Sequence, residues 1–547
     1  MSSLYIKEAT GVDELTTAGS QDHPFKTPAY ALFASQQKSD ATEPKLFVFK
    51  TEDNEYQEIS ASALKKARKG CDGLKKKAVK QKEQELKKQQ KEAENAAKQL
   101  SALNITIKED ESLPAAIKTR IYDGSYSKVG QRVKVSGWIH RLRSNKKVIF
   151  VVLRDGSGFI QCVLSGDLAL AQQTLDLTLE STVTCTGKTA PGGVELNVDY
   201  YEVVGLAPGG EDSFTNKIAE GSDPSLLLDQ RHLALRGDAL SAVMKVRAAL
   251  LKSVRRVYDE EHLTEVTPPC MVQTQVEGGS TLFKMNYYGE EAYLTQSSQL
   301  YLETCLASLG DVYTIQESFR AEKSHTRRHL SEYTHIEAEL AFLTFDDLLQ
   351  HIETLIVKSV QYVLEDPIAG PLVKQLNPNF KAPKAPFMRL QYKDAITWLN
   401  EHDIKNEEGE DFKFGDDIAE AAERKMTDTI GVPIFLTRFP VEIKSFYMKR
   451  CSDDPRVTES VDVLMPNVGE ITGGSMRIDD MDELMAGFKR EGIDTDAYYW
   501  FIDQRKYGTC PHGGYGIGTE RILAWLCDRF TVRDCSLYPR FSGRCKP

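Results

Sequence analysis

Residues 318–339 read Ser-Phe-Arg-Ala-Glu-Lys-Ser-His-Thr-Arg-Arg-His-Leu-Ser-Glu-Tyr-Thr-His-Ile-Glu-Ala-Glu, two strand-like runs joined by a loop. Arginines and a lysine crowd this stretch beside alternating carboxylates: Arg320, Lys323, Arg327 and Arg328, with His329 as a titratable neighbour. Planar guanidinium groups bind phosphate oxygens, and carboxylates hold divalent cations. The stretch therefore predicts a basic hairpin for a nucleoside polyphosphate with its metal. A surface hairpin crowded with ion pairs is the alternative.

A glycine-rich segment farther along the chain points to the same chemistry. Residues 513–521 read Gly-Gly-Tyr-Gly-Ile-Gly-Thr-Glu-Arg, and an apolar run follows them. Such glycines let a backbone approach a ligand closely, and a helix that starts near Thr519 would point free N–H groups at an anion, with Arg521 adding a charge. The segment is not a P-loop, because no Gly-Lys-Ser/Thr follows, and it lacks the features of a dinucleotide fingerprint.

The sequence around these segments predicts one large α+β domain over residues 238–547. Apolar residues from Val243 to Val257 recur at intervals of three and four, which marks an amphipathic helix after Gly237. Pro268 is expected to end that helix and open a strand, and residues 311–316 read as another strand. Gly, Pro and Ser concentrate between residues 205 and 224, so residues 208–237 are predicted to be a hinge.

Residues 128–204 are predicted to be all-β, within a domain assigned to residues 113–207. Runs rich in β-branched and aromatic residues at 132–140, 148–153, 159–164 and 182–186 read as strands. Asp155-Gly156 and Gly192-Gly193 supply turns between them. A handful of strands in one short segment suits a small barrel, and an OB-fold is the leading candidate because such barrels bind oligonucleotides on one face. The pattern alone equally allows an SH3-like barrel.

The N-terminal part divides into an extension over residues 1–60, whose fold the sequence leaves open, and a lysine-rich arm over 61–112. Between Lys65 and Lys98 there are 13 Lys or Arg against 5 Asp or Glu. Residues 74–102 contain no glycine or proline and are predicted to form a helix roughly 40 Å long. The excess of one sign favours an arm directed at RNA, and a solvated charged helix is the alternative.

The composition excludes several other classes of protein. The formal charge of −11 argues against a nucleic-acid partner, but residues 65–98 carry +8 and the rest of the chain −19. No apolar run is long enough to span a membrane, and residues 1–10 lack the pattern of a signal peptide. The ten cysteines form no C-x-x-C pair or zinc-like cluster. We therefore expect a soluble cytoplasmic protein with reduced thiols and no membrane partner.

Three segments together resemble the signature motifs of the class II aminoacyl-tRNA synthetases. They are Pro268, the Phe319-Arg320-Ala321-Glu322 hairpin and the Gly516-x-Gly518-x-Glu520-Arg521 segment, in the family's order. The barrel placed before the catalytic domain resembles the subgroup that charges Asp, Asn and Lys. Over residues 115–547 the resemblance implies an antiparallel catalytic sheet, a homodimer formed partly through Pro268, and chemistry on ATP with Mg²⁺.

The resemblance assigns roles to individual residues. Arg320 would hold the amino-acid carboxylate and the α-phosphate, and Arg521 the γ-phosphate, so these two are the candidate catalytic residues. Glu322 would contact adenine, His329 the γ-phosphate, and Tyr333 would stack. The candidate ATP-binding set is Arg320, Glu322, Arg328, His329, Leu330, Tyr333, Glu470, Ile471, Gly518 and Arg521. The candidate metal-binding set is Asp462, Glu470 and Gly473, with an interval between the carboxylates one residue longer than in some relatives.

Two departures from the aspartyl enzymes decide which amino acid we expect. Arg477 matches the arginine that binds the side-chain oxygen of either substrate. Aspartyl enzymes place a lysine against the second carboxylate oxygen of the substrate, and this chain has Leu302 at that position. Where those enzymes have an Asp, this chain has Glu337, a longer acceptor that would repel a substrate carboxylate. Both favour asparagine. Glu277 would hold the α-amino group from a mobile loop with Gly278 and Gly279. The candidate amino-acid-binding set is Glu277, Ser297, Gln299, Arg320, Glu337, Gly473 and Arg477.

In the barrel, Phe150 and Gln161 match residues with which this subgroup stacks on and reads the central anticodon uridine, and Glu195 is a further candidate contact. A core phenylalanine is the alternative for Phe150. The expected activity is the ATP-dependent ligation of asparagine to tRNA(Asn) through an asparaginyl-adenylate. An aspartyl-tRNA synthetase, a non-catalytic tRNA-binding paralogue and an ammonia-dependent asparagine synthetase are the alternatives, although the last usually lacks the barrel.

Overall fold

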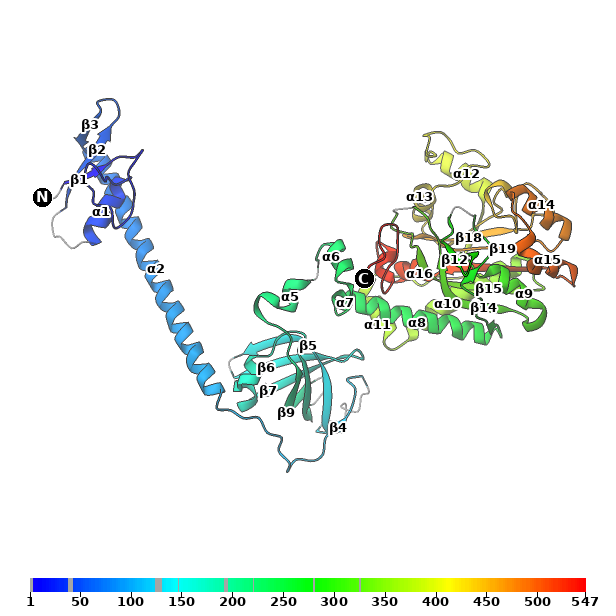
Figure 1. The fold of residues 1–547 in the computed structure, drawn as a ribbon, viewed down its shortest axis with the longest axis horizontal. Coiled ribbons are helices and arrows are strands. Elements are labelled where there is room, and N and C mark those ends of the chain that lie inside the picture. Colours follow the sequence, from blue (N-terminus) through cyan, green and yellow to red (C-terminus); the bar gives the residue numbers. More distant parts are fainter. Residues whose placement is uncertain are drawn as a thin grey trace. The chain divides into compact units, whose positions relative to one another are not determined.

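The computed structural model describes residues 3–37, 43–122, 130–145, 147–190, 195–219, 221–278, 281–323 and 326–547, without the side chains of 81–83 and 85–101. Two compact units are present, residues 1–217 and 218–547, and each is described by itself. Figure 1 labels the elements of both units. No described helix is long and apolar enough to cross a membrane.

The first 60 residues contain a small sheet and one helix. Strands β1 (Ser3–Ile6), β2 (Lys45–Lys50) and β3 (Glu55–Glu58) lie in that order, with β1 parallel and β3 antiparallel to β2. Helix α1 (Pro28–Gln37) packs with them around a core that includes Ile6, Phe25, Leu32 and Leu46. The sequence left this region open because no periodic pattern in it is strong.

The lysine-rich helix starts earlier than the sequence predicted. Helix α2 spans Ala61–Ala102, 42 residues or about 63 Å, whereas the expected start lay after Gly73. A glycine within a helix costs only about 1 kcal/mol, which packing can offset. Here a Cβ on Gly70 would meet the Ala29 Cβ at 2.8 Å, so the glycine allows close packing beside α1. The apolar residues Leu86, Ala93, Ala97 and Leu100, which recur at helical spacing in this segment, lie among the undescribed side chains.

The all-β domain is a closed barrel. Its strands are β5 (Arg132–Asn145), β6 (Val148–Arg154), β7 (Phe159–Ser165), β8 (Thr182–Thr189) and β9 (Glu195–Gly205). They pair in the order β5-β6-β7-β9-β8, and β8 returns to β5. Strand β4 (Ile117–Lys118) joins β5, and helices α3 (Asp167–Leu170) and α4 (Gln172–Leu175) connect β7 to β8. The predicted strands are confirmed, and the turn at Gly192-Gly193 lies outside the described residues.

The segment predicted as a hinge contains short helices. These are a 3₁₀ turn at Gly210–Asp212, α5 (Phe214–Lys217), α6 (Pro224–Asp229) and α7 (Arg231–Ala234). Arg231 is 3% exposed, and its guanidinium donates to the carbonyls of Arg533, Ser536 and Leu537. The second half of the segment is thus anchored to the C-terminal end of the chain, because a buried guanidinium needs several acceptors.

The second unit is built on a large sheet. Within the described residues, eight strands lie in the order β10-β14-β15-β20-β19-β18-β17-β16, antiparallel except for the outer pairs β10–β14 and β16–β17. Their bounds are β10 Thr264–Glu265, β14 Val312–Phe319, β15 Glu332–Ala341, β16 Met388–Gln391, β17 Ile434–Thr437, β18 Ser460–Met465, β19 Gly469–Met476 and β20 His512–Gly518. Residues 318–339 therefore comprise the end of β14, the loop after it and most of β15, the second and third strands of this sheet.

Helices cover one face of this sheet and form the main core with it. Helices α8 (Asp238–Glu260), α10 (Phe345–Glu365), α11 (Ala369–Leu376) and α16 (Thr519–Leu526) contribute buried residues to that core, and Figure 1 shows the first three side by side. Helix α8 confirms the amphipathic helix that the spacing of apolar residues from Val243 to Val257 predicts. Pro268 does not end it, however. The helix stops at Glu260, where His262 adopts φ 64° in the left-handed region.

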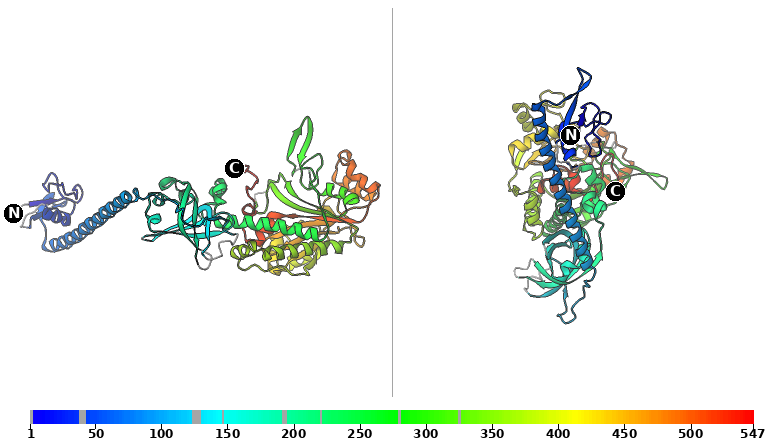
Figure 2. Two further views of the ribbon diagram at one scale, coloured as in Figure 1. Left: turned by 90° about the horizontal axis from the view of Figure 1, so that it is seen from below. Right: turned by 90° about the vertical axis from the view of Figure 1, so that its left-hand side faces the viewer.

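The remaining elements surround the edges of the sheet. Strands β11 (Met271–Val272), β12 (Lys284–Tyr287) and β13 (Glu290–Leu294) form a separate small sheet, whose green hairpin β12–β13 projects in Figure 2. The other helices are α9 (Gln299–Leu309), α12 (Tyr392–Glu401), α13 (Glu420–Ile430), α14 (Met481–Glu491) and α15 (Tyr499–Lys506), with 3₁₀ turns at Val441–Ile443, Asp496–Tyr498 and Val532–Cys535. The candidate site lies on the face of the central strands opposite helices α8, α10, α11 and α16.

Candidate active site

A cavity of about 300 Å³ lies against the central strands of the second unit. It gathers every residue that the sequence placed in the nucleotide, metal and amino-acid sets, which come from segments spread over some 240 positions. These residues are Glu277, Ser297, Gln299, Arg320, Glu322, Arg328, His329, Leu330, Tyr333, Glu337, Asp462, Glu470, Ile471, Gly473, Arg477, Gly518 and Arg521. Pro268 is half-buried and does not line the cavity.

Strand alternation explains why these side chains converge. On β15 the odd-numbered residues 333–339 line the cavity, while Ile336 and Leu340 are buried in the core under the helices. The neighbouring glycines have a role that the sequence did not indicate. A Cβ on Gly516 would come within 2.2 Å of His335 Nε2, and one on Gly514 within 2.1 Å of Glu339 Oε2. These glycines therefore make room for the His335 and Glu339 side chains of β15.

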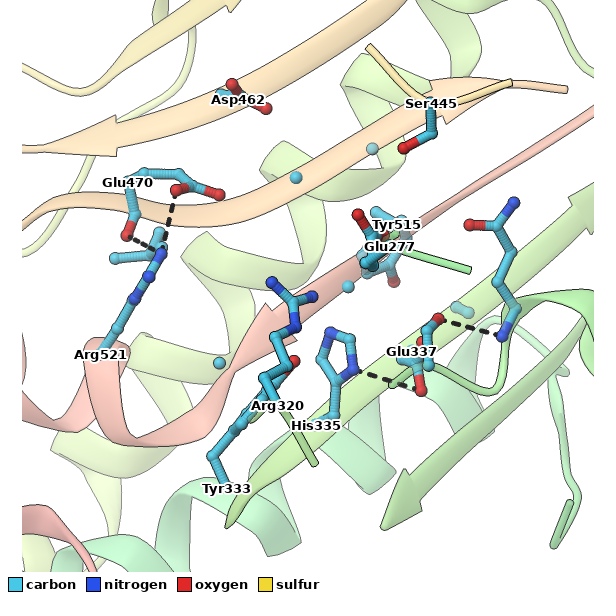
Figure 3. Close-up of a pocket in the computed structure, with 18 of the residues that line it drawn as sticks. Glu277, Arg320, Tyr333, His335, Glu337, Ser445, Asp462, Glu470, Tyr515 and Arg521 are labelled. Carbon is cyan, nitrogen blue, oxygen red and sulfur yellow. Dashed lines mark hydrogen bonds and ion pairs between the residues drawn. The ribbon is translucent and has the colours of Figure 1, made fainter. Parts of the chain in front are cut away.

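At one end of the cavity, which we call the nucleotide end, Arg320 faces open space. Its Nε is buried and has no hydrogen-bond partner among the described residues. The guanidinium lies 5.6 Å from the centre of the Tyr333 ring (Figure 3). Burial opposes its charge, but Tyr333, Glu277 and Glu322 raise the pKa of Arg320 above its ordinary value. A buried guanidinium with an unused donor is prepared for an anionic ligand.

Arg521 and Glu470 form an ion pair beside it. Arg521 Nη1 donates to Glu470 Oε2 at 3.0 Å, and Arg328 Nη2 donates to the Glu470 carbonyl at 3.1 Å. Burial alone would raise the pKa of Glu470, but Arg521, Arg328 and Lys444 lower it to about 2. Burial, and then Arg521, lower the pKa of His329, so its imidazole is neutral near pH 7. The permanent positive charge at this end therefore rests on arginines and on Lys444.

Asp462 and Glu470 converge on one point above the sheet. A Cβ added to Gly473 would lie 3.5 Å from Asp462 Oδ1 and 3.5 Å from Glu470 Oε1. The register also accounts for the long interval between the carboxylates. Asp462 pairs with Gly473, but a shift between Val463 and Leu464 brings Glu470, rather than Ile471, opposite Leu464. This bulge places both carboxylates on the same face.

These two carboxylates fit a divalent cation. They converge over a residue without a side chain, and hard oxygen donors suit Mg²⁺. Asp462 also accepts a hydrogen bond from Lys444 Nζ at 2.8 Å. Burial raises the pKa of Asp462 to about 6, against the opposing effect of Lys444. A second group, Glu303, Glu339 and His512, is compact enough to hold a cation, but Arg505 and Arg477 already neutralise its carboxylates.

At the other end of the cavity, which we call the amino-acid end, Glu337 is held by the protein itself. Its carboxylate accepts from the Ser297 hydroxyl and from the Ser298 backbone N–H at 2.9 Å, and His335 Nδ1 lies 3.3 Å from it. Burial alone would raise the pKa of Glu337, but His335 and these donors lower it. Glu337 is 3% exposed and stays anionic. Its negative charge therefore faces the cavity.

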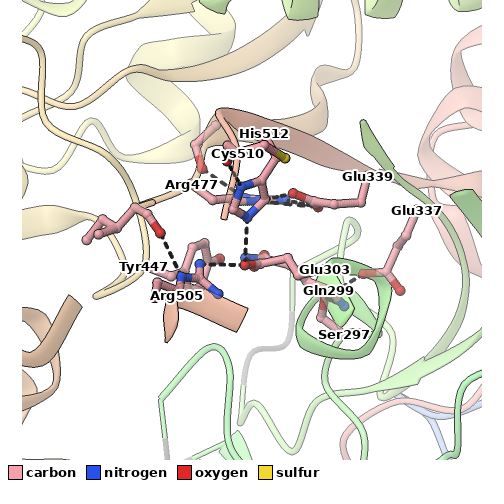
Figure 4. A network of polar contacts seen from close by, with 12 residues as sticks. Ser297, Gln299, Glu303, Glu337, Glu339, Tyr447, Arg477, Arg505, Cys510 and His512 are labelled. Carbon is pink, nitrogen blue, oxygen red and sulfur yellow. Dashed lines mark hydrogen bonds and ion pairs between the residues drawn. The ribbon is translucent and has the colours of Figure 1, made fainter. Parts of the chain in front are cut away.

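The arginine at this end is neutralised. Arg477 Nε and Nη2 donate to Glu339 at 3.0 Å each, and its Nη1 donates to Ser475 at 2.8 Å. Figure 4 shows a second layer behind this pair, in which Glu303 accepts from Arg505, His512 and Gln299. Burial alone would raise the pKa of Glu303, but Arg505 and His512 lower it to about 2. The network fixes the orientation of Arg477 and Gln299.

The Gln296 side chain holds the loop that carries Glu277 in place. The side-chain oxygen of Gln296 accepts the backbone N–H groups of Val276 and Glu277 at 2.9 and 3.1 Å, and its amide donates to the Gly278 carbonyl at 2.9 Å. Tyr447 Oη donates to Glu277 Oε1 at 3.1 Å. Glu277 therefore has a defined position at the cavity wall. Gly279 of the predicted glycine loop lies outside the described residues.

The barrel brings together the three candidate anticodon residues. Ile149, Val151 and Leu153 of β6 are buried in the barrel core, so Phe150 points to the outer face, where it is half-exposed. Gln161 is likewise on the outer face of β7, next to β6, and donates to Glu195 on β9. The alternative of a core phenylalanine is therefore wrong. Phe150 and the Gln161–Glu195 pair share one outer face on three neighbouring strands.

Comparison with protein families places both units. Residues 223–542, more than half of the chain, match the model for "tRNA synthetases class II (D, K and N)". The chain belongs to this family of class II tRNA synthetases. Residues 133–204 match an "OB-fold nucleic acid binding domain", which decides between the two barrel folds. Residues 20–114 match an "Asparaginal-tRNA synthetase, N-terminal domain".

Known class II synthetases resemble this chain over its whole length. It is 98% identical to a protein of Saccharomyces cerevisiae named "Asparagine--tRNA ligase, cytoplasmic", with 100% of each covered. It is 51% identical to the human protein of the same name, again with 100% of each covered. The structure of Entamoeba histolytica asparaginyl-tRNA synthetase in complex with asparaginyl-adenylate matches with a TM-score of 0.75 at 42% identity, covering 80% of this chain and 100% of that one.

The class II synthetase site also contains residues that the sequence did not single out. His335 and Glu339 lie within the quoted stretch, and their alternation with Glu337 was a usable signal. Lys444, Ser445 and Tyr447 belong to a segment with no motif of its own, which follows a 3₁₀ turn. Arg505 and His512 act from behind the cavity wall. No local sequence pattern marks Lys444, Ser445, Tyr447, Arg505 or His512 as site residues.

Proposed function

We propose that this chain ligates asparagine to tRNA in the cytoplasm. Asparagine and ATP would first form an asparaginyl-adenylate with release of pyrophosphate. The acyl group would then pass to the terminal ribose of the tRNA with release of AMP. Support comes from the relative that is 98% identical and named a cytoplasmic asparagine--tRNA ligase, and from the related structure that holds asparaginyl-adenylate. The proposed substrates are thus ATP, asparagine and tRNA(Asn).

The charge balance at the amino-acid end carries the choice of asparagine. Arg477 is paired with Glu339, and Leu302, where a lysine would complement a carboxylate, is apolar and 1% exposed. Glu337 remains as an anion. A substrate carboxylate would meet this negative charge with no unpaired cation to offset it, whereas an amide N–H can donate to Glu337. This arrangement supports asparagine over aspartate.

The nucleotide end supports adenylate formation. The asparagine carboxylate attacks the α-phosphorus, the bond to the bridging oxygen breaks, and pyrophosphate leaves with its electron pair. Arg320 would hold the carboxylate and the α-phosphate, and Arg521 the γ-phosphate, so the protein supplies positioning and positive charge. Bound Mg²⁺, held by Asp462 and Glu470, would neutralise phosphate charge. Glu322 and Tyr333 would hold adenine, and Glu277 the α-amino group.

The decisive assay is amino-acid-dependent pyrophosphate exchange by the full chain. We expect exchange with asparagine and at least a hundredfold less with aspartate at equal concentration, because buried polar mismatches carry large penalties. Preference for aspartate would indicate an aspartyl-tRNA synthetase instead. Absence of exchange with either amino acid, together with intact tRNA binding, would indicate a non-catalytic paralogue.

We also propose that tRNA contacts the first unit at two places. Phe150 would stack on the central anticodon base while Gln161 and Glu195 read it, since an aromatic side chain on an OB-fold face is a base-stacking platform. The lysine-rich helix α2 would attract the phosphate backbone. Deletion of residues 1–102 should raise the KM for tRNA and flatten its salt dependence, with pyrophosphate exchange unchanged. An unchanged salt dependence would reduce the helix to a solvated surface.

The domain boundaries and the assembly are further proposals. We assign residues 1–60 to the N-terminal extension, 61–112 to the arm, 113–207 to the anticodon-binding barrel, 208–237 to the connection and 238–547 to the catalytic domain. The resemblance to dimeric class II enzymes supports a homodimer formed partly through Pro268, which is half-buried in the single chain. Sedimentation of the full chain should give twice the chain mass, and a monomer would overturn this proposal.

A further inference from the structure

Helix α13 lies outside the three motif segments, yet its first turn reaches the nucleotide end of the cavity. Glu420 and Glu423 are three residues apart on α13, and therefore share one side of the helix. Arg328 Nη1 lies 3.6 Å from Glu420 Oε1 and 3.7 Å from Glu423 Oε1. The Glu423 side chain is 13% exposed and the Glu420 side chain 31%. Glu423 is thus the deeper partner of an arginine that lines the cavity.

Glu423 is also bonded to the strand that carries a candidate metal ligand. The Glu470 backbone N–H donates to Glu423 Oε1 at 3.1 Å, and the Glu470 carbonyl accepts from Arg328 Nη2 at 3.1 Å. Glu423, Arg328 and the Glu470 backbone therefore form a closed ring of contacts. Both main-chain polar groups of Glu470 are used in it. The ring sets where the Glu470 side chain leaves the strand.

The residue before Glu470 is shaped to admit this ring. Gly469 has φ 80°, and a Cβ there would lie 2.9 Å from Glu423 Oε1 and 3.0 Å from Arg328 Nη1. The Glu423 carboxyl and the Arg328 guanidinium therefore pack directly against bare backbone at the start of β19. Arg328 Nε is buried and has no hydrogen-bond partner among the described residues, as expected of a group arranged for a ligand.

We propose that Glu423 is a positioning residue for ATP, which acts by holding Arg328 and the Glu470 backbone in fixed relative positions. This inference rests on the proposed function. Neither carboxylate oxygen of Glu423 needs to touch the substrate. Small displacements of groups that orient a reacting phosphate reduce the rate steeply, so a residue that fixes two of them affects ATP without affecting asparagine.

The test compares three variants of the full chain by pyrophosphate exchange. Glu423→Ala removes both contacts, and we expect the KM for ATP to rise about tenfold, since a buried hydrogen bond to a charged group is worth that much. The KM for asparagine should stay within twofold. Glu423→Gln keeps an oxygen for the Glu470 N–H but loses the ion pair, so its KM for ATP should lie in between. Glu420→Gln, the more exposed comparison, should change the KM for ATP less than twofold.

A second measurement separates this inference from the proposed function. Calorimetric titration with a non-hydrolysable ATP analogue should show the same order of affinities, with Glu423→Ala weakest. Equal increases in the KM for ATP and for asparagine, or an equal effect of Glu420→Gln, would overturn the inference. If Glu423→Ala does not fold, unchanged ATP affinity in Glu423→Gln would also overturn it. Absence of asparagine-dependent exchange in the unaltered chain would instead overturn the proposed function.

Discussion

The two ends of the cavity differ in how far the protein itself satisfies the hydrogen-bonding groups of their charged side chains. At the nucleotide end, Arg320 and Arg328 keep buried Nε donors with no partner among the described residues. At the amino-acid end, Arg477 is matched by Glu339 and Ser475, and Glu337 accepts from Ser297 and Ser298 beside His335. Unused cationic donors suit a polyphosphate. Charges that are already paired leave no attraction for a second carboxylate, and so suit a neutral amide.

Removal of a cation at the nucleotide end should have the largest effect. In Arg521→Ala, we expect pyrophosphate exchange to fall by about 10²–10³-fold, because positive charge that stabilises a reacting phosphate is lost. Arg521→Lys should recover only part of the rate, since an ammonium cannot reproduce the planar fork. Exchange within tenfold of the unaltered chain in Arg521→Ala would contradict the assigned role of this end.

Removal of the counter-charge at the amino-acid end should change selectivity more than rate. In Glu339→Gln, Arg477 loses its anionic partner and can attract a substrate carboxylate. We expect the preference for asparagine over aspartate in kcat/KM to narrow by about 10–100-fold. Glu332→Gln on the same strand is the control, because Glu332 is exposed and outside the cavity. An unchanged preference in Glu339→Gln would show that the pair does not set selectivity.

A change in the barrel should spare both ends of the cavity. In Phe150→Ala, we expect pyrophosphate exchange to stay within twofold, while kcat/KM for tRNA charging falls about tenfold, as for the loss of one stacked base. Both activities are measured on one preparation, so that exchange controls for folding. If exchange falls as far as charging, the role of Phe150 is structural.

The smallest expected effect concerns the network behind the amino-acid end. Burial lowers the pKa of His512, but Glu303 and Glu339 together raise it, so the net shift is upward from the ordinary value of 6.5. A raised histidine pKa gives stability that is fully present below pH 6.5 and is lost as pH rises through the folded-state pKa. Thermal unfolding at pH 6 should show the unaltered chain about 2 °C more stable than His512→Gln, with a smaller difference at pH 9. An equal difference at both pH values would exclude a charged His512.

The nucleotide end was predictable because its signals are local. Arg320, Glu322, Arg328 and His329 lie within ten residues on one hairpin, and Arg521 lies in the first turn of the helix after the glycine-rich strand. Alternation along strands then places such residues on one face. The predicted start of helix α2 was wrong because the contact that decides it is not local in the sequence. Gly70 read as a helix boundary, and only its close approach to Ala29 explains why a glycine stands inside the helix.

The sequence by itself determined the order of the motifs, the strand and helix periods, and the residue types that meet in the cavity. Only the tertiary structure decided which charges are left unpaired. Arg505 reaches Glu303 across 202 positions, Arg477 reaches Glu339 across 138, and Lys444 meets Asp462 from a segment without a motif. Pairing depends on distances of about 3 Å between side chains from remote segments. Burial increases the energetic effect of each pairing, because an unpaired charge inside a protein is costly. The fold therefore sets the selectivity of a site whose residue types the sequence already contained.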